Sequence, residues 1–477
     1  MSYQVSQHTD KDKIFIIKRS KIEGRLDPHY NQPAFSELWH LLSFISAELT
    51  TLKKNSICIF SGITPKSGGD AYTLEDKGIP FVRSGDFSEN NEIDFTNLLL
   101  LREDVHNGIM YNSRLKTNDL LIAIVGATIG KVGVYQYNIE ANINQAICAV
   151  RLKETLDPYY VQAFFQTNIG QKIIERIKRP VARANINLAE VGNLPIPLFS
   201  LEKQRKIVER MNMGRLYKKE KDIEAQQLLD SIDDYLLKEL GITMPCINNH
   251  LDNRMFIVQK KELNGRYTPS LYKDNVRLHS VIYDNVTLSH LAYINPNTRL
   301  PCKNKVMQIS YVPMESVNEI YAEINDNKNC IVEESKGLTR FQEGDLLWAK
   351  ITPCMENGKS AIAKNLINGY GCGSTEFHVI RPKNDKLLVG YIHSLLHMKL
   401  VRQTAKLYFG GSAGQQRVAV DFLENFNVPF PPMVKQQEIV DHINDIRTRA
   451  KALQTEGKVI LEDAKRKVEQ MIIGESK

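Results

Sequence analysis

The sequence predicts an α+β protein built from two tandem β-rich modules, each followed by a long α-helix, with the two helices paired as an antiparallel coiled coil. Two observations predict this architecture: an internal repeat that recurs in both halves of the chain, and a proline-free stretch of alternating charged and apolar residues after each copy. At 477 residues the chain is also too long for one ordinary domain. We place the modules at 1–198 and 254–432, the helices at 199–242 and 433–477, and a linker at 243–253.

The repeat consists of six blocks that occur in the same order in both copies. The first block, 14–30, shares Phe, Gly, Arg and Pro with 255–272. Preserved order is not expected by chance, and the small drift in spacing is what loop insertions between fixed elements produce. The other blocks are an Asp-Leu-Leu run at 119–121 and 345–347, a Gly-Lys pair at 130–131 and 358–359, matched Arg, Glu and Asn residues within 183–193 and 417–427, a Pro-x-Pro exit at 195–197 and 429–431, and a Lys-Gln pair followed by Ile-Val at 203–208 and 435–440.

The middle of each module is predicted to be β-rich. Short apolar or alternating runs, such as 120–125 and 346–351, are separated by Gly, Asn and Asp clusters. We expect a helix before the strands of the first copy, at 33–49, and one after the strands of each copy, at 158–177 and 389–405.

The two long helices carry narrow apolar seams. One amphipathic helix often lies on its own domain, but two at equivalent places in a duplication favour pairing with each other. Apolar residues recur every seven positions in the second helix, with 443, 450, 464 and 471 on the same face. The residues that we assign to the coiled coil are Leu229, Ile232, Leu236, Leu240, Ile439, Ile446, Leu453 and Ile460.

The composition excludes several classes of protein. With 42% hydrophobic and 25% charged residues the chain is of the average globular type. Its longest apolar run, 120–127, is far shorter than the roughly 20 residues of a membrane helix, and its first residues lack a signal core. Seven cysteines without a CxxC pair argue against a disulfide framework or a zinc module. We therefore expect a cytoplasmic protein with reduced thiols, no metal site and no membrane contact.

Motifs for catalysis are incomplete. The run 126–131 resembles a phosphate-binding loop but is one residue short, and its counterpart 353–360 has Pro where the first Gly belongs. The runs 27–30 and 157–160 resemble the Asp-Pro-Pro-Tyr motif of adenine methyltransferases but lack the second proline. We therefore expect no catalytic residue in this chain.

The ordered blocks are similar to those of the specificity (S) subunits of type I restriction–modification systems. The second copy is the closer match, and the resemblance covers nearly the whole chain except the first dozen residues. It is carried by 311–315, 344–347, 350–359 and 373–377 in the second copy and by 81–86, 119–130 and 144–145 in the first.

The resemblance implies that each module is a target recognition domain that reads one half of a bipartite double-stranded DNA sequence. It implies that the helices set the gap between the half-sites and dock two methyltransferase (M) subunits, with restriction (R) subunits completing the enzyme. S-adenosylmethionine, ATP and Mg would then bind to those partners and not to this chain. The two β-rich middles differ, which predicts an asymmetric target. A net charge of +7 is compatible with a polyanionic partner.

Three other interpretations stay open on the sequence. The chain could be the specificity partner of a type IIB-like restriction–methylation enzyme, a protein-interaction scaffold without DNA, or an unrecognised enzyme.

Loop side chains with hydrogen-bond donors or acceptors are the candidates for DNA contacts, because such groups reach phosphates and base edges. Residues shared by the copies, such as Arg183 and Arg417, favour phosphate or scaffold roles, since residues that read different bases should differ. The shared Gly-Lys lysines either point to solvent from a turn or contact a phosphate. The candidates are Lys66, Ser67, Arg83, Thr128, Lys131, Lys178, Arg179, Arg183, Lys303, Lys350, Thr352, Lys359, Ser412, Gln415, Gln416 and Arg417.

Overall fold

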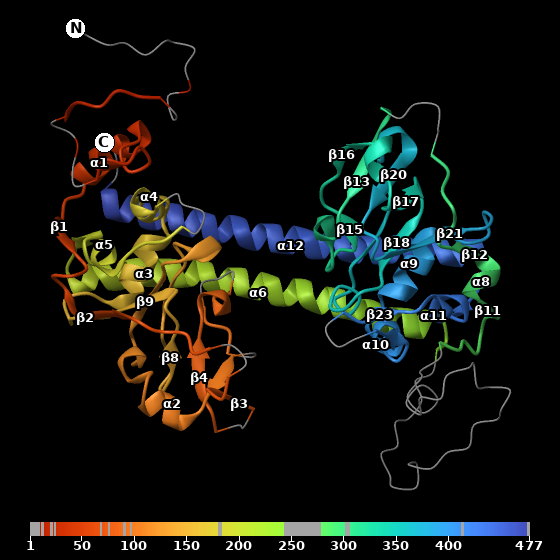
Figure 1. Cartoon of the computed structure of the whole chain (residues 1–477), viewed down its shortest axis with the longest axis horizontal. Helices are drawn as coiled ribbons and strands as arrows, with labels where there is room; N and C mark the ends of the chain where they lie inside the picture. The colour runs from red at the N-terminus through yellow and green to blue at the C-terminus, as the bar shows by residue number, and fades with distance from the viewer. Residues whose placement is uncertain are drawn as a thin grey trace. The chain divides into compact units, whose positions relative to one another are not determined.

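The chain forms two compact units, residues 1–221 with 455–477 (unit 1) and residues 222–454 (unit 2). Each contains one β-rich module and part of both long helices, as Figure 1 shows. The fold is therefore of the predicted α+β class, with two tandem modules and two long helices. This computed structural model describes residues 10, 14–19, 22, 25–66, 69–74, 77–88, 92–95, 98–179, 184–242, 278–300, 306–411 and 415–474.

The module of unit 1 is built on two four-stranded sheets. The first has the order β2–β9–β6–β7 and is antiparallel. The second has the order β3–β5–β4–β8, with β4 and β8 parallel, and β1 pairs with β10. In chain order the elements are α1 (Pro33–Ser43), β1 (Glu48–Thr51), β2 (Ser56–Ser61), β3 (Tyr72–Thr73), β4 (Ile79–Val82), β5 (Leu99–Leu101), α2 (Glu103–Asn107), β6 (Leu120–Ala123), β7 (Val132–Val134), β8 (Asn142–Ile143), β9 (Ile147–Leu152), α3 (Pro158–Gln166), α4 (Asn168–Ile177), α5 (Leu188–Gly192), β10 (Pro195–Leu198) and the long helix α6 (Leu201–Glu239).

Strand β6 connects the two cores of unit 1. All four of its residues are buried. Leu120 and Ile122 pack in the core that contains α3, α4 and the long helices, whereas Leu121 packs in the core that contains residues of β4 and β8. Because successive side chains of a strand point to opposite faces, a strand that is covered on both sides needs an uninterrupted apolar run.

Unit 2 repeats this plan. Its four-stranded sheets have the orders β12–β21–β18–β19 and β16–β13–β20–β17, the second again with one parallel pair, β13 with β20. The pair β11–β24 corresponds to β1–β10. The elements are β11 (Asn285–Thr287), α8 (Leu288–Leu291), β12 (Ala292–Ile294), β13 (Gln308–Val312), β14 (Val317–Asn318), β15 (Glu323–Ile324), β16 (Lys328–Ile331), β17 (Thr339–Gln342), β18 (Leu346–Ala349), β19 (Ser360–Ile362), β20 (Tyr370–Gly373), β21 (Phe377–Pro382), α9 (Val389–His397), α10 (Lys399–Lys406), β22 (Phe409–Gly410), β23 (Arg417–Val418), α11 (Val420–Glu424), β24 (Asn427–Pro429) and the long helix α12 (Met433–Ile473).

Three of the predicted helices differ from the structure. The first, expected over 33–49, ends at Ser43, and Leu49 lies in β1. The β-branched pair Thr50–Thr51 favours a strand there, and β10 supplies its partner. The helix expected over 158–177 is two helices, because the Thr167 side chain caps α4 by accepting from Gly170 N. The helix expected over 389–405 is likewise divided, at Met398.

A buried glutamine fixes the start of each long helix to its module. Gln204 accepts a hydrogen bond from Asp157 N (2.8 Å) and donates to the carbonyls of Thr155 (3.0 Å) and Phe199 (2.8 Å). Gln436 repeats the arrangement by accepting from the backbone N–H of residue 388 (2.9 Å) and donating to the carbonyls of residues 386 and 431 (both 3.0 Å). This is the structural reason for the Lys-Gln block of the repeat.

Two further polar anchors are common to the modules. The hydroxyls of Tyr160 and Tyr391 donate to the carbonyls of residues 197 and 429, at 2.7 and 2.6 Å, within the Pro-x-Pro exits. The Asp of each Asp-Leu-Leu run is almost fully buried and forms a two-bond ion pair with an arginine of the neighbouring strand: Asp119 with Arg151 and Asp345 with Arg381. The blocks of the repeat are therefore mainly scaffold.

The helices α6 and α12 pair antiparallel within unit 1. Arg210 lies 3.5 Å from Asp463, and Lys221 lies 3.3 Å from Glu456, so residue numbers rise along α6 as they fall along α12. A Cβ on Gly214 would lie 2.4 Å from the Ala464 Cβ, which shows how closely the backbones approach.

The same antiparallel pairing occurs within unit 2. The Lys435 ammonium lies 2.5 Å from Glu239, and the Tyr235 and His442 rings are 4.1 Å apart. Of the seam residues assigned from the sequence, Ile232, Leu236, Leu240, Ile439 and Ile446 are buried in one apolar cluster.

The other assigned seam residues are less buried. Leu229 and Leu453 are partly buried against Ala225 and Ala450. Ile460 of unit 1 lies at the edge of a surface groove, and the buried residues near that end of α12 are instead Ala464, Val468 and Ile472. The seam drifts because a straight α-helix has 3.6 residues per turn, not the 3.5 of a strict heptad.

Candidate nucleic-acid interface

The structure brings most of the described candidates of unit 2 into one loop cluster. Val418 N donates to the Lys350 carbonyl (2.8 Å), and Thr352 N donates to the Gln416 carbonyl (3.0 Å). Ile351 forms a β-bridge with Arg417. These backbone contacts hold the end of β18 beside β23, so Lys350, Thr352, Gln416 and Arg417 share one surface.

Arg417 is held by a carboxylate in this cluster. Its Nε and Nη2 donate to the Glu376 side chain at 2.9 and 2.7 Å, and the arginine stays 42% exposed. The hydrogen bond from Arg417 lowers the pKa of Glu376. Half-exposure leaves part of the guanidinium accessible, but the geometry gives Arg417 a scaffold role as well.

In unit 1 the corresponding loops also meet. Gly126 N donates to the Ala184 carbonyl (3.1 Å), and Asn185 forms β-bridges with Val125 and Arg179. The loop that contains Thr128 therefore lies close to Ala184 and Asn185.

The basic candidates of unit 1 are mostly paired with acids. Arg179 Nη2 donates to Glu190 (2.8 Å), which also accepts from Arg25 (3.1 Å). Lys178 lies 3.3 Å from Glu175. The Arg83 guanidinium likewise donates to the Asp86 carboxylate, at 2.8 Å.

Lys131 and Lys359, the lysines of the shared Gly-Lys pairs, both donate to backbone carbonyls. The Lys131 ammonium donates to the carbonyls of Phe87 (2.9 Å) and Ser88 (3.3 Å), and Lys359 donates to that of Met314 (3.2 Å). In both modules this side chain is partly buried. It links the antiparallel four-stranded sheet to the turn that follows a strand of the other four-stranded sheet, β4 in unit 1 and β13 in unit 2. A partly buried carbonyl is stabilised by such a donor. Both lysines therefore have a scaffold role, and their assignment as DNA contacts stays a prediction.

The remaining candidates are scattered or lie outside the described residues. Lys66 is exposed in the loop after β2, and Gln415 is exposed before β23. The candidates outside the described residues are Ser67, Arg183, Lys303 and Ser412.

Two arginines at matched positions of the modules are not among the residues predicted from the sequence. Arg114 precedes Asp119 at the same spacing as Arg340 precedes Asp345, and each lines a surface groove of its module. This shared spacing was a signal in the repeat itself. Arg114 donates to the Asn107 side chain (2.6 Å).

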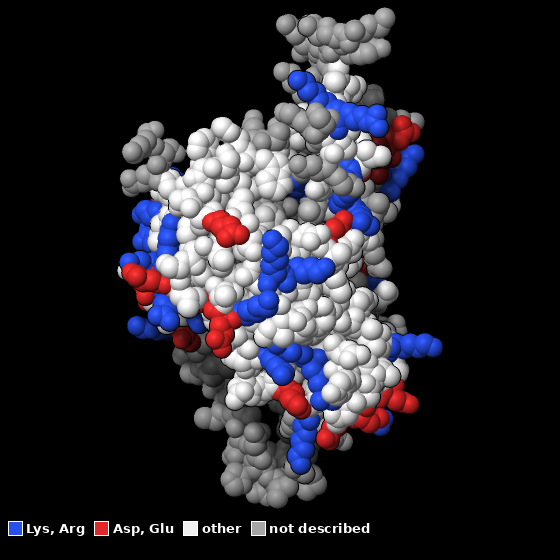
Figure 2. Space-filling model, turned by 90° about the vertical axis from the view of Figure 1, so that its left-hand side faces the viewer, with Lys and Arg blue, Asp and Glu red and all other residues white. Residues whose placement is uncertain are grey.

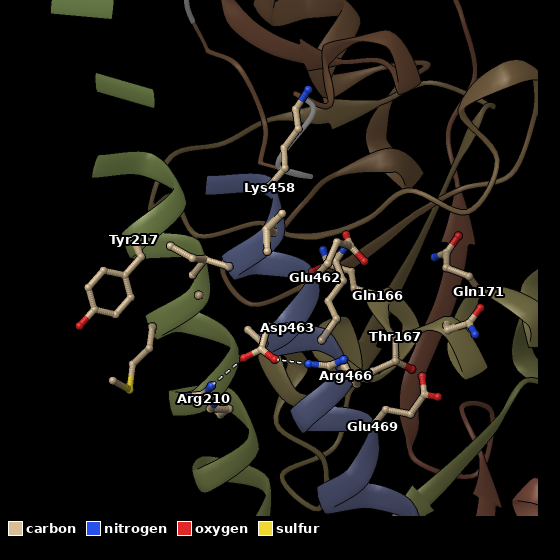
Figure 3. A pocket seen from close by; sticks show the side chains of 17 residues that line it. Gln166, Thr167, Gln171, Arg210, Tyr217, Lys458, Glu462, Asp463, Arg466 and Glu469 are labelled. Carbon is tan, nitrogen blue, oxygen red and sulfur yellow. Dashed lines mark hydrogen bonds and ion pairs between the residues drawn. The ribbon is translucent and has the colours of Figure 1, made fainter. Parts of the chain in front are cut away.

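The charge of unit 1 is mixed on the surfaces seen here. In Figure 2 Lys and Arg form several separate groups with Asp and Glu beside them, and uncharged side chains cover most of the face. Figure 3 shows the groove between α6, α12 and the α3–α4 corner, where Arg210 and Arg466 both face Asp463. A groove with both signs of charge does not favour a polyanion.

The described residues contain neither a membrane-crossing helix nor a metal cluster. No described helix combines the length and apolar character that crossing a bilayer requires. No described group of three or more His, Cys, Asp or Glu side chains is placed to hold a metal ion. Cys58, Cys148, Cys330, Cys354 and Cys372 are free thiols.

Comparison with known proteins identifies the family. A sequence profile for the type I restriction modification DNA specificity domain matches residues 57–233 and 283–460, which is each copy of the repeat and more than half of the chain. The chain belongs to this type I specificity family. Membership favours the type I interpretation over a type IIB-like partner, a scaffold without DNA or an unrecognised enzyme.

Two curated members of the type I specificity family align over shorter regions at higher identity. The EcoEI specificity subunit of Escherichia coli is 40% identical over 158 residues, 32% of this chain and 26% of that protein. The EcoAI specificity subunit of Escherichia coli is 34% identical over 193 residues, 39% of this chain and 31% of that protein. Each alignment thus spans less than a third of the relative's length.

Among solved structures, a chain from a study of complex assembly and conformational transition of the type I R-M system is 13% identical. The match covers 89% of this chain and 96% of that one, with a TM-score of 0.47.

Proposed function

We propose that this chain is the DNA sequence-specificity subunit of a type I restriction–modification complex and recognises a bipartite, asymmetric target. Each module would read one half-site. The observation that carries the proposal is the duplication of one polar frame, Gln204 with Gln436 and Asp119 with Asp345, beneath loops that differ. One frame with two sets of loops suits one task performed on two DNA sequences.

In this proposal the chain acts in the cytoplasm and catalyses no reaction. Two M subunits would methylate adenine, R subunits would cleave, and these partners would hold S-adenosylmethionine, ATP and Mg. The paired helices α6 and α12 would supply the docking surface for the M subunits. Half-sites read from one face of B-DNA lie about one helical turn apart, roughly 34–36 Å, and in this proposal the paired helices would set their separation.

The test is to co-express the chain with its candidate M subunits and to map methylated adenines across the host genome. We expect one gapped, asymmetric motif that disappears when this chain is deleted. Methylation without a motif, or a motif that survives the deletion, would contradict the proposal.

A further inference from the structure

A basic groove of about 530 Å³ lies on the module of unit 2. Four segments of the chain form it: 295–298 after β12, the turn and strand 336–340, Lys350 after β18, and part of β21. Phe377 and Val379 contribute apolar surface, and Asn297, Thr298 and Thr339 contribute polar groups.

The charge of this groove has one sign. Among the described residues that line it, Lys336, Arg340 and Lys350 are basic and none is acidic. Two carboxylates lie near these cations: Glu333, which lies 4.0 Å from the exposed Lys336, and Glu376, which interacts electrostatically with Lys350. Neither of them lines the groove, which distinguishes it from the one in Figure 3, where cations and carboxylates are paired.

Arg340 is available to a ligand in a way that its counterpart is not. Within the described part of the chain, its guanidinium has no hydrogen bond or ion pair, although the residue is half-buried. Arg114, at the matched position of unit 1, donates to Asn107 and lies 4.6 Å from the Tyr111 ring. The groove around Arg114 also contains Glu140.

Hydrogen bonds to the underlying sheet hold the segment 295–298 in place at the wall of the groove. Arg381 donates to the Thr298 hydroxyl (2.8 Å) while its other donors hold the buried Asp345. Asn295 accepts from Val379 N (3.0 Å) and so holds the segment after β12 on the sheet. A pre-formed, one-sign basic groove with an unengaged guanidinium suits phosphate, which arginine binds through two parallel N–H groups.

We propose that this groove binds the DNA sugar–phosphate backbone at the half-site of module 2, with Arg340 as the main phosphate ligand. The inference rests on the proposed function and adds a contact that is specific to one module. Because a phosphate contact carries no sequence information, it sets affinity and its salt dependence but not the motif.

The experiment uses the full chain assembled with its M subunits and measures Kd for a duplex with the mapped motif and for an unrelated duplex at several salt concentrations. We expect Arg340→Gln to reduce the slope of log K against log salt by about 1, and the triple variant Lys336→Gln/Arg340→Gln/Lys350→Gln to reduce it by about 2–3. Both duplexes should weaken by similar factors, and the methylation motif should stay the same.

Two controls accompany these variants. Lys386→Gln removes an exposed lysine outside the groove and should leave the slope unchanged. Arg340→Lys keeps the charge and should retain most of the slope, which separates loss of charge from loss of folding. An unchanged slope in the triple variant, or a changed motif, would overturn the groove assignment. A wild-type complex that binds neither duplex would instead overturn the proposed function.

Discussion

Gln204 and Gln436 show at the scale of single residues why the two copies share blocks of sequence. Each lies fully buried near the start of a long helix and satisfies one backbone N–H and two carbonyls of its module. A buried backbone group without a partner costs free energy, so the glutamine is required wherever this helix start meets this module.

We therefore expect Gln436→Ala to lower the free energy of unfolding of unit 2 by about 1–3 kcal/mol, because one buried and two partly buried backbone groups lose their partner. Urea unfolding of the full chain measures the loss. The neighbouring Gln437 is exposed and bonds only Asp441 one turn away, so Gln437→Ala is the matched control and should change little. Equal losses for the two variants would rule out the role of the buried amide.

The pair of Glu376 and Arg417 predicts a pH dependence. The hydrogen bond from Arg417 lowers the pKa of Glu376 below its value in an unfolded chain, about 4.3. The pair therefore stabilises unit 2 above that pH, and the contribution is lost as pH falls through the lowered pKa.

We expect Glu376→Gln to lower the thermal unfolding midpoint at pH 7 and to approach the wild type as the pH falls toward 3. Thermal unfolding of both proteins across this pH range tests it. A deficit that is independent of pH would show that the charge of Glu376 does not contribute.

At the scale of elements, small residues allow α6 and α12 to pack closely. The sequence pattern indicates only a heptad repeat of apolar residues. Gly214 lies within a helix. Replacing a glycine at such a position by alanine usually raises the stability of the helix by up to about 1 kcal/mol. Here an added Cβ would lie 2.4 Å from the Ala464 Cβ.

Gly214→Ala should therefore destabilise unit 1, by about 1–3 kcal/mol, because the helices must move apart. Met213 is 49% exposed on the same helix, and Met213→Ala should be close to neutral. Hydrogen exchange along α6 and α12 locates the effect. A stabilised Gly214→Ala protein would mean that the helices do not pack at this position.

At the scale of the whole molecule, the duplicated frame predicts that modules are interchangeable. The hydrogen bonds described for Gln436 and Tyr391 are formed with backbone groups of the second module. Gln204 and Tyr160 form the corresponding hydrogen bonds with backbone groups of the first module. A module can therefore be exchanged together with its Pro-x-Pro exit without loss of these contacts.

A chain whose second module is replaced by a copy of the first should direct methylation to a motif with two copies of one half-site. The measurement is the same genome-wide methylation map, with the wild-type chain as control. Retention of the original second half-site would show that specificity lies outside the modules.

The sequence by itself determined the duplication, the long helices and most of their seam, because these depend on local periodicity and on residues repeated in order. It also showed that Asp119, Asp345 and the Lys-Gln pairs are shared by the two copies, but not which groups these residues contact. Only the tertiary structure decided that Lys131 and Lys359 serve backbone carbonyls and that β4–β8 and β13–β20 are parallel pairs. Likewise, only the fold placed Arg340 and Lys350 in one groove. The physical reason is that these contacts join segments far apart in the chain, and a side chain's partner depends on what the fold brings to it.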